Sequence, residues 1–244
     1  MHCRVTAIVP AAGLGRRFGP GTNKLLQILE GKPLIVWPLE TLESVKEIEE
    51  IIPVLKEEDR AKASEVFGQF GLSKVKRIAV GGKERQDSVY NGIKLIEDRD
   101  GIVLVHDGAR PFIDKVLIER SIKEMLSPTN SPLEKGSKGG FDGIVLGVPV
   151  KDTIKEVNRG IVKKTLRRDT LWAIQTPQLF LYSPLAAAFE KAIMEGFYST
   201  DESALVEKYG GKIKVIMWSY RNIKITTPED LAIAEYLLSR ISEK

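Results

Sequence analysis

Short runs of β-branched residues alternate with helical patterns along most of this 244-residue chain. Runs of this length and composition are typical of strands that are buried on both faces of a parallel sheet. Their alternation with helices predicts a single α/β domain over residues 1–244, with a mostly parallel sheet and helices on both of its faces. We expect strands at residues 5–9, 51–55, 77–80, 102–106 and 144–148. We expect helices at residues 32–45, 59–70, 87–97, 115–126 and 228–241. A further helix is expected to start at Ser199, where Glu202 completes a capping-box pattern.

Residues 151–172 depart from this alternation. They read K-D-T-I-K-E-V, then N-R-G, then I-V-K-K-T-L. Alternating residues on either side of an N-R-G turn predict a β-hairpin. An isolated two-stranded hairpin is only marginally stable in water. We therefore expect this segment to be an arm that pairs with a second copy of the chain in a homodimer.

The composition excludes several classes of protein. The net charge of +4 comes from basic and acidic residues that are interspersed, which suits a small anionic ligand better than a nucleic acid. With one cysteine and two histidines, the chain has neither an internal disulfide framework nor a structural zinc site. No window approaches the roughly 18 apolar residues of a membrane span, and the N-terminal apolar run is too short for a signal peptide. We expect a cytoplasmic protein.

The loop after the first predicted strand has the composition of a phosphate site. It reads A-A-G-L-G-R-R from Ala11 to Arg17, and Lys24 follows. Glycines let backbone N–H groups approach an anion, and the two cations add the positive charge that polyphosphate chemistry needs. Phe18 stands where the dinucleotide fingerprint requires its third glycine, and Lys24 lacks the flanking residues of a P-loop lysine. The loop therefore predicts a phosphate-binding site of another kind.

Polar residues also follow other predicted strands. Asp107 and Arg110 come after residues 102–106, where a carboxylate can meet Mg²⁺ or sugar hydroxyls. A structural role is favoured for His106, because no nucleophile motif accompanies it. Lys224 lies in a β-branched run, and taken alone it is expected to extend to water.

The ordered set of motifs resembles the 2-C-methyl-D-erythritol 4-phosphate cytidylyltransferases of the non-mevalonate isoprenoid pathway. Each motif is weak alone, but together they span nearly the whole chain in the family's order. The motifs are A-A-G-L-G-R-R with Lys24, G-G-K-E-R-Q-D-S, H-D-G-A-R-P, P-V-K-D-T, T-P-Q, T-D-E-S and N-I-K-I-T-T-P-E-D-L.

This resemblance implies a Rossmann-like nucleotidyltransferase fold, a homodimer formed through the arm, Mg²⁺, and CTP and a polyol phosphate as substrates. A ribitol 5-phosphate cytidylyltransferase is the alternative, because it shares most of the motifs. The implied catalytic residues are Arg17, Lys24, Arg168 and Lys224, with Arg168 serving the partner's site. The implied nucleotide-binding residues are Ala11, Ala12, Gly13, Leu14, Gly15, Gly82, Ser88, Asp107 and Arg110, with Asp107 also the metal ligand. The implied contacts to the second substrate are Thr153, Thr176 and Thr200.

The chemistry of the implied reaction explains these residue types. A phosphate group is already a competent nucleophile and needs no general base. The difficulty lies in bringing one anion against another, so catalysis rests on positioning and on neutralising charge at the α-phosphate. A site with several cations and no catalytic His, Ser or Cys is expected.

Overall fold

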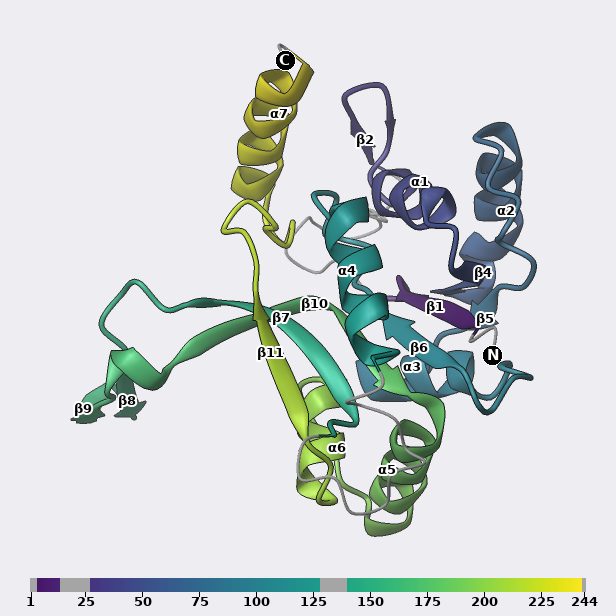
Figure 1. The fold of residues 1–244 in the computed structure, drawn as a ribbon. Coiled ribbons are helices and arrows are strands. Elements are labelled where there is room, and N and C mark those ends of the chain that lie inside the picture. The colour runs from purple at the N-terminus through teal and green to yellow at the C-terminus, as the bar shows by residue number, and fades with distance from the viewer. Residues whose placement is uncertain (1–3, 14–26, 128–139, 243–244) are drawn as a thin grey trace.

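The computed structural model of the chain describes residues 4–13, 27–127 and 140–242. A seven-stranded sheet runs through it in the order β11-β7-β10-β6-β1-β4-β5 (Figure 1). Neighbouring strands are parallel except where β10 pairs with β6 and β7, so the predicted mostly parallel sheet is confirmed. The strands are β1 Val5–Pro10, β4 Ile48–Leu55, β5 Ala79–Val80, β6 Ile102–Val105, β7 Gly143–Pro149, β10 Trp172–Leu181 and β11 Ile213–Met217.

Helices cover both faces of the sheet, as predicted. In β1, Val5, Ala7 and Val9 enter one buried cluster while Ile8 enters the other, which is the period-two alternation of a strand buried on both sides. Helices α1, α2, α4 and α7 pack into the first cluster, and α3, α5 and α6 pack into the second. The helices are α1 Val36–Ser44, α2 Arg60–Gln69, α3 Arg85–Ile93, α4 Lys115–Met125, α5 Tyr182–Glu195, α6 Glu202–Lys208 and α7 Pro228–Ser242.

Two predicted helix starts are wrong. The helix expected from residue 32 begins at Val36, because β3 (Lys32–Pro33) pairs antiparallel with β2 (Ile28–Leu29). The helix start expected at Ser199 is at Glu202, whose N-cap is Asp201: the Asp201 carboxylate accepts from the Ala204 N–H at 3.0 Å.

The predicted arm is confirmed as a β-hairpin. Strands β8 (Lys155–Asn158) and β9 (Ile161–Thr165) pair antiparallel, and every residue in them is exposed. Arg159 and Gly160 both have positive φ, 47° and 80°, as a tight turn between twisted strands requires. The chain leaves the sheet after β7 and returns at β10, so the arm stands away from the rest of the molecule (Figure 1).

Candidate active site

The centre of the sheet contains the point where the strand order reverses. From β1 the chain builds outward to β4 and β5, and it then returns to place β6 on the other side of β1. Ligands of open α/β sheets bind at the carboxyl ends of the strands at such a point. A cavity of about 950 Å³ opens here. It is lined by Pro10, Ala12, Gly13, Lys56, Glu57, Glu58, Val80, Gly81, Gly82, Lys83, Glu84, Arg85, Ser88, Asp107, Ala109, Lys224 and Thr226.

Two loops meet closely on one side of this cavity. A Cβ atom added to Gly81 would lie 2.3 Å from the Cβ of Ala12, so only glycine lets the loop after β5 approach the loop after β1. The Gly82 N–H donates to Ser88 Oγ at 3.0 Å, and this hydroxyl donates to the Glu84 carbonyl at 3.1 Å. The glycines thus bring backbone from two strand ends to the same wall.

Asp107 follows β6 and is surrounded by cations. The Lys224 ammonium lies 2.8 Å from its Oδ2, and Nε and Nη2 of Arg85 each lie 3.2 Å from its Oδ1. Arg110 Nε lies 3.6 Å from Oδ2. Burial raises the pKa of Asp107, but the charges of the three cations outweigh it and hold this pKa well below its usual range. Asp107 is therefore a permanent carboxylate.

The position of Asp107 is fixed from beneath by neutral groups. Its N–H donates to Thr176 Oγ1 at 3.0 Å, and this hydroxyl also contacts His106 Nδ1 at 3.1 Å. His106 Nε2 lies 3.0 Å from the Arg110 carbonyl. The imidazole is fully buried, and burial lowers its pKa to about 4. His106 is neutral and bonded at both ring nitrogens, as expected for a structural residue.

This buried imidazole predicts a pH dependence of stability. The unfolded chain binds a proton at His106 below its ordinary pKa of 6.5, whereas the folded chain resists protonation until about 4. The free energy of unfolding should therefore fall by about 3 kcal/mol between these pH values as the solution is acidified. Urea unfolding of the wild type and of His106→Gln from pH 7 to 4 tests this. Burial raises the pKa of Glu202 and gives an opposite slope, but that contribution cancels in the difference curve. Parallel curves would contradict the expectation.

Lys224 reaches the site on a loop anchored by Asn222. The Asn222 amide donates to the Thr176 carbonyl at 2.9 Å, and the Asn222 carbonyl accepts from Arg110 Nη1 at 2.7 Å. The Ile225 N–H donates to the Ala109 carbonyl at 2.9 Å. The interpretation that Lys224 extends to water is wrong, because these bonds aim it into the cavity at Asp107.

The sequence and the fold of this chain can be compared with those of known proteins. A family model described as IspD, 2-C-methyl-D-erythritol 4-phosphate cytidylyltransferase, matches residues 5–240. The chain belongs to this family. The protein of that name from Geotalea uraniireducens is 43% identical over 244 residues, covering 99% of each chain. The one from Clostridioides difficile is 43% identical over 235 residues, covering 96% of this chain and 93% of the relative.

Solved structures of IspD proteins have the same fold. The 4-diphosphocytidyl-2C-methyl-D-erythritol synthase from Anaerococcus prevotii superposes with a TM-score of 0.79 at 30% identity, covering 98% of this chain and all of the other. The Francisella tularensis 2-C-methyl-D-erythritol 4-phosphate cytidylyltransferase gives 0.78 at 28% identity, covering 96% and 99%. As a member of the IspD family, the chain is thus an enzyme of the nucleotidyltransferase class with a Rossmann-like fold.

The structure brings together several of the residues predicted for an IspD site. Ala12, Gly13, Gly82, Ser88, Asp107 and Lys224 line the cavity, and Arg110 flanks Asp107. Ala11 is buried, with its N–H donating to the Val54 carbonyl at 2.8 Å. Thr176 is buried beneath Asp107, and Thr200 is exposed just before α6. Thr153 and Arg168 lie beyond the cavity, in the arm segment. Leu14, Gly15, Arg17 and Lys24 fall outside the described residues.

Two residues beside the predicted site residues are not indicated by the sequence, namely Arg85 and Glu202. Arg85 lines the cavity and contacts both Asp107 and Glu202. Arg85 belongs to the motif G-G-K-E-R-Q-D-S and Glu202 to the motif T-D-E-S. The sequence therefore shows a charged residue in each motif. Neither motif reveals that the two side chains meet.

Asp107 supplies one carboxylate to a divalent cation, and its charged neighbours are cations, so phosphate oxygens would have to supply further ligands. Within residues 4–13, 27–127 and 140–242, no cluster of three or more His, Cys, Asp or Glu side chains is placed to hold a metal by itself. Mg²⁺ in nucleotide sites uses one or two carboxylates together with phosphate oxygens and water. Asp107 offers one such carboxylate at the strand end, which fits a metal that binds together with a nucleotide.

Proposed function

We propose that this chain transfers the cytidylyl group of CTP to 2-C-methyl-D-erythritol 4-phosphate in non-mevalonate isoprenoid biosynthesis. The products are 4-diphosphocytidyl-2-C-methyl-D-erythritol and pyrophosphate. The observation that carries this proposal is the carboxylate of Asp107 among three cations at the switch point of a sheet of the IspD family. The relatives compared above bear the methylerythritol name, which favours this substrate over ribitol 5-phosphate.

The mechanism follows from charge and position. An oxygen of the substrate phosphate attacks the α-phosphorus of CTP, and the bond to pyrophosphate breaks, with the electron pair leaving on pyrophosphate. No base is required, consistent with a buried and neutral His106. Lys224 offers an ammonium to the phosphates at the cavity wall, and Arg17, Lys24 and the partner's Arg168 are proposed to add further positive charge. Charge stabilisation by such preorganised donors is the main source of catalysis in phosphoryl transfer.

A divalent cation completes this proposal, and we take it to be Mg²⁺. Asp107 would hold it, with Lys224 and Arg85 moderating the charge of the carboxylate. When bound, the cation neutralises negative charge on the phosphates. On the second-substrate side, Thr153, Thr176 and Thr200 remain the predicted contacts. The Thr176 hydroxyl is bonded to the Asp107 N–H and to His106, so it would act on the substrate through Asp107.

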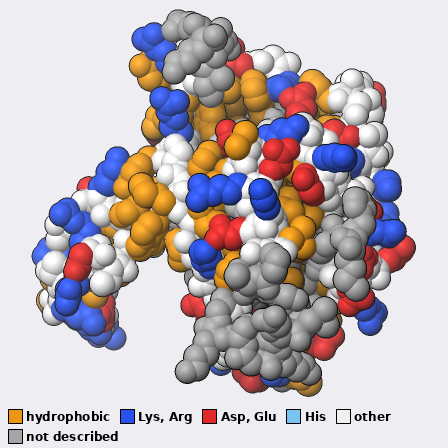
Figure 2. Space-filling view, in the orientation of Figure 1, with side chains coloured by type: hydrophobic (Ala, Val, Ile, Leu, Met, Phe, Trp, Pro, Cys, Tyr) orange, Lys and Arg blue, Asp and Glu red, His pale blue; other side chains and the backbone are white. Residues whose placement is uncertain are grey.

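The arm supports a homodimer in this proposal. Its strands expose Val157, Ile161 and Val162, which are poor choices for a hairpin surrounded by water. Figure 2 shows hydrophobic side chains gathered where the arm joins the domain, where Trp172 and Ile174 of β10 are exposed. A second copy that covers this surface would bury both groups. No helix among the described residues is long and apolar enough to cross a membrane, and a cytoplasmic location remains a prediction.

A direct assay tests the proposed function. Pyrophosphate release is measured with CTP and Mg²⁺, using 2-C-methyl-D-erythritol 4-phosphate and ribitol 5-phosphate as competing acceptors. We expect kcat/KM to favour the methylerythritol substrate by at least about a hundredfold, because a site built for one set of hydroxyls leaves polar groups unpaired with the other. Turnover of ribitol 5-phosphate alone would replace the proposal with the alternative. Nucleotide binding without turnover of either acceptor would overturn it.

The close contact between the two cavity loops gives a second prediction. Gly81→Ala places a methyl group 2.3 Å from the Cβ of Ala12 and forces these loops apart. We expect a loss of about 2 kcal/mol in stability and a KM for CTP raised by roughly tenfold, because the backbone that faces the nucleotide moves. Gly68→Ala in α2 is the control, since its new methyl would meet nothing within 4 Å. Equal KM values in the two variants would contradict the assignment of this wall to CTP.

A further inference from the structure

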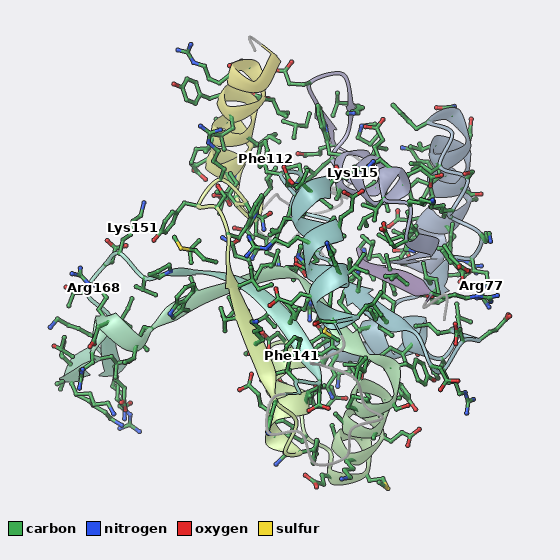
Figure 3. The ribbon with its side chains drawn as sticks, viewed as in Figure 1. Arg77, Phe112, Lys115, Phe141, Lys151 and Arg168 are labelled. Atoms are coloured by element: carbon green, nitrogen blue, oxygen red, sulfur yellow. The ribbon has the colours of Figure 1, made fainter. Side chains whose placement is uncertain are left out.

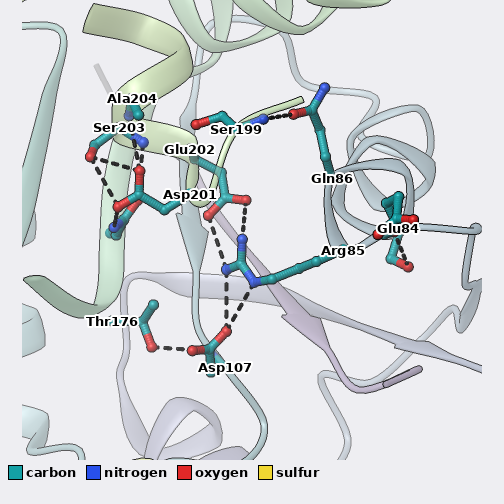
Figure 4. Close-up of polar contacts among 12 residues, drawn as sticks. Glu84, Arg85, Gln86, Asp107, Thr176, Ser199, Asp201, Glu202, Ser203 and Ala204 are labelled. Atoms are coloured by element: carbon teal, nitrogen blue, oxygen red, sulfur yellow. Dashed lines mark hydrogen bonds and ion pairs between the residues drawn. The ribbon is translucent and has the colours of Figure 1, made fainter. Parts of the chain in front are cut away.

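The first turn of α3 is joined to residues 197–202 by three consecutive side chains. Arg85 forms an ion pair with Glu202, and Gln86 accepts from the Ser199 N–H (Figure 4). Gln86 also donates to the Phe197 carbonyl, and Asp87 accepts from the Tyr198 hydroxyl. The Gln86 contacts are 3.0 Å to the Phe197 carbonyl and 2.8 Å from the Ser199 N–H. This turn follows the glycines assigned to the nucleotide, while residues 197–202 include Thr200, assigned to the second substrate.

Arg85 lies between two buried carboxylates. Its Nη1 and Nη2 donate to the two carboxylate oxygens of Glu202 at 2.6 and 3.1 Å. Its Nε and Nη2 lie 3.2 Å from Oδ1 of Asp107. A planar guanidinium has donors on two edges, so it can hold two carboxylates in one fixed arrangement, which an ammonium cannot do.

Glu202 has no access to the cavity of its own. Its side chain is 1% exposed and does not line the cavity, whereas Arg85 and Asp107 do. Among the described residues, Arg85 is the side chain that links Glu202 to the cavity, so Glu202 acts on the site through Arg85. Glu202 accepts from Nη1 and Nη2 of Arg85, so Arg85 reaches Asp107 only at Oδ1. Oδ2 of Asp107 then faces Lys224.

We propose that Arg85 and Glu202 are a positioning pair. The pair orients the Asp107 carboxylate, and it fixes the turn that contains Thr200 relative to the loop that contains Gly82. The roles of Gly82 and Thr200 in this statement rest on the proposed function. Neither Arg85 nor Glu202 reacts with substrate. Their effect is to keep the two halves of the site at a fixed separation.

The chain offers a matched control for this pair. Arg77 forms a bidentate pair with Glu50, with Nε and Nη2 at 2.7 and 2.6 Å from the two carboxylate oxygens. Neither residue lines the cavity of the site, and Arg77 lies on the opposite side of the domain from the arm (Figure 3). Glu50→Gln therefore reports the cost of neutralising a comparable Arg–Glu pair without disturbing Asp107.

The test compares Glu202→Gln with Glu50→Gln in the full-length chain. Amide hydrogen exchange without substrates should become faster in Glu202→Gln at residues 197–204 and also at residues 106–110. Glu50→Gln should leave both segments unchanged. In the pyrophosphate-release assay, Glu202→Gln should lower kcat/KM for the polyol phosphate by roughly ten- to a hundredfold, the range typical of losing a residue that orients a site carboxylate. Glu50→Gln should keep wild-type kinetics.

A second variant covers a failure of Glu202→Gln to fold. Arg85→Lys keeps the charge balance but loses the fork, so it should show the same exchange and kinetic changes. If both segments of Glu202→Gln or Arg85→Lys exchange as in Glu50→Gln, the proposal is overturned. Faster exchange confined to residues 197–204, with normal kinetics, also overturns it, because the pair would then only anchor α6. The exchange experiment needs no substrate. If the wild type fails to turn over the polyol phosphate, the proposed function is overturned, but the exchange experiment still tests the positioning pair.

Discussion

Asp107→Asn is expected to reduce kcat to about a thousandth of the wild-type value with CTP and Mg²⁺. The substitution keeps the shape of the side chain and removes its charge. Three cations, Arg85, Arg110 and Lys224, then lose their shared counter-ion. The carboxylate that would hold the divalent cation is lost as well. Initial rates of pyrophosphate release at saturating substrates measure this effect directly.

The same variant should behave in the opposite way in a metal-free binding experiment. Titration calorimetry with CTP in the presence of a chelator should show an affinity equal to or above that of the wild type, because the freed cations attract the triphosphate. Asp114→Asn is the control. Asp114 follows the same strand, but its carboxylate caps α4 by accepting from the Leu117 N–H at 3.0 Å. Asparagine is as good an N-cap as aspartate, so Asp114→Asn should leave both the stability and kcat close to their wild-type values. A kcat for Asp107→Asn within tenfold of wild type would remove Asp107 from the chemistry.

The strands that are continuous apolar runs could be predicted from the sequence. A strand that contains a residue unfavourable to a sheet could not. β1 and β6 are buried on both faces, so their composition alone identifies them. β10 carries Pro177 in its interior, which argues against a central strand. The structure accommodates Pro177 because the pairing of β10 with β7 shifts register between Gln175 and Gln178. Pro177 therefore lies where no N–H donor to β7 is needed.

The site could be predicted to the extent that its residues follow strand ends. The loop after β1, the glycines after β5 and Asp107 after β6 meet because parallel strands end at one edge of the sheet. Arg85 and Glu202 are separated by 117 positions and start two different helices. No local pattern places them in contact. The direction of Lys224 likewise depends on the bonds of Asn222 to Thr176, which only the folded chain supplies.

Arg168→Ala is expected to lower kcat by about a hundredfold, and a partner subunit that keeps Arg168 should restore activity at one site of a mixed dimer. Arg168 lies on the arm, away from the domain (Figure 3), and does not line the described part of the cavity. Its Nη1 donates to the Lys151 carbonyl at 2.6 Å. The root of the arm is also fixed, because Lys151 Nζ lies 3.6 Å from the ring centre of Tyr220, whose hydroxyl donates to the Pro149 carbonyl at 2.7 Å. An arginine that is ordered but remote from its own site suits a role in the partner's site, where losing one preorganised charge has an effect of this size.

Mixed dimers of Arg168→Ala and Lys224→Ala subunits test this role. If the arm acts in trans, one site of each mixed dimer receives Lys224 from one subunit and Arg168 from the other, and it is intact. Random association should then restore about a quarter of the wild-type activity, because half of the dimers are mixed and each has one working site. Each variant alone sets the baseline, and differently tagged subunits purified in tandem verify the mixed species. Mixed dimers as inactive as either parent would place Arg168 outside the partner's site. Arg167→Ala is the control for the arm and should keep the wild-type kcat by itself, because the Arg167 guanidinium is engaged by Asp169 in its own exposed turn.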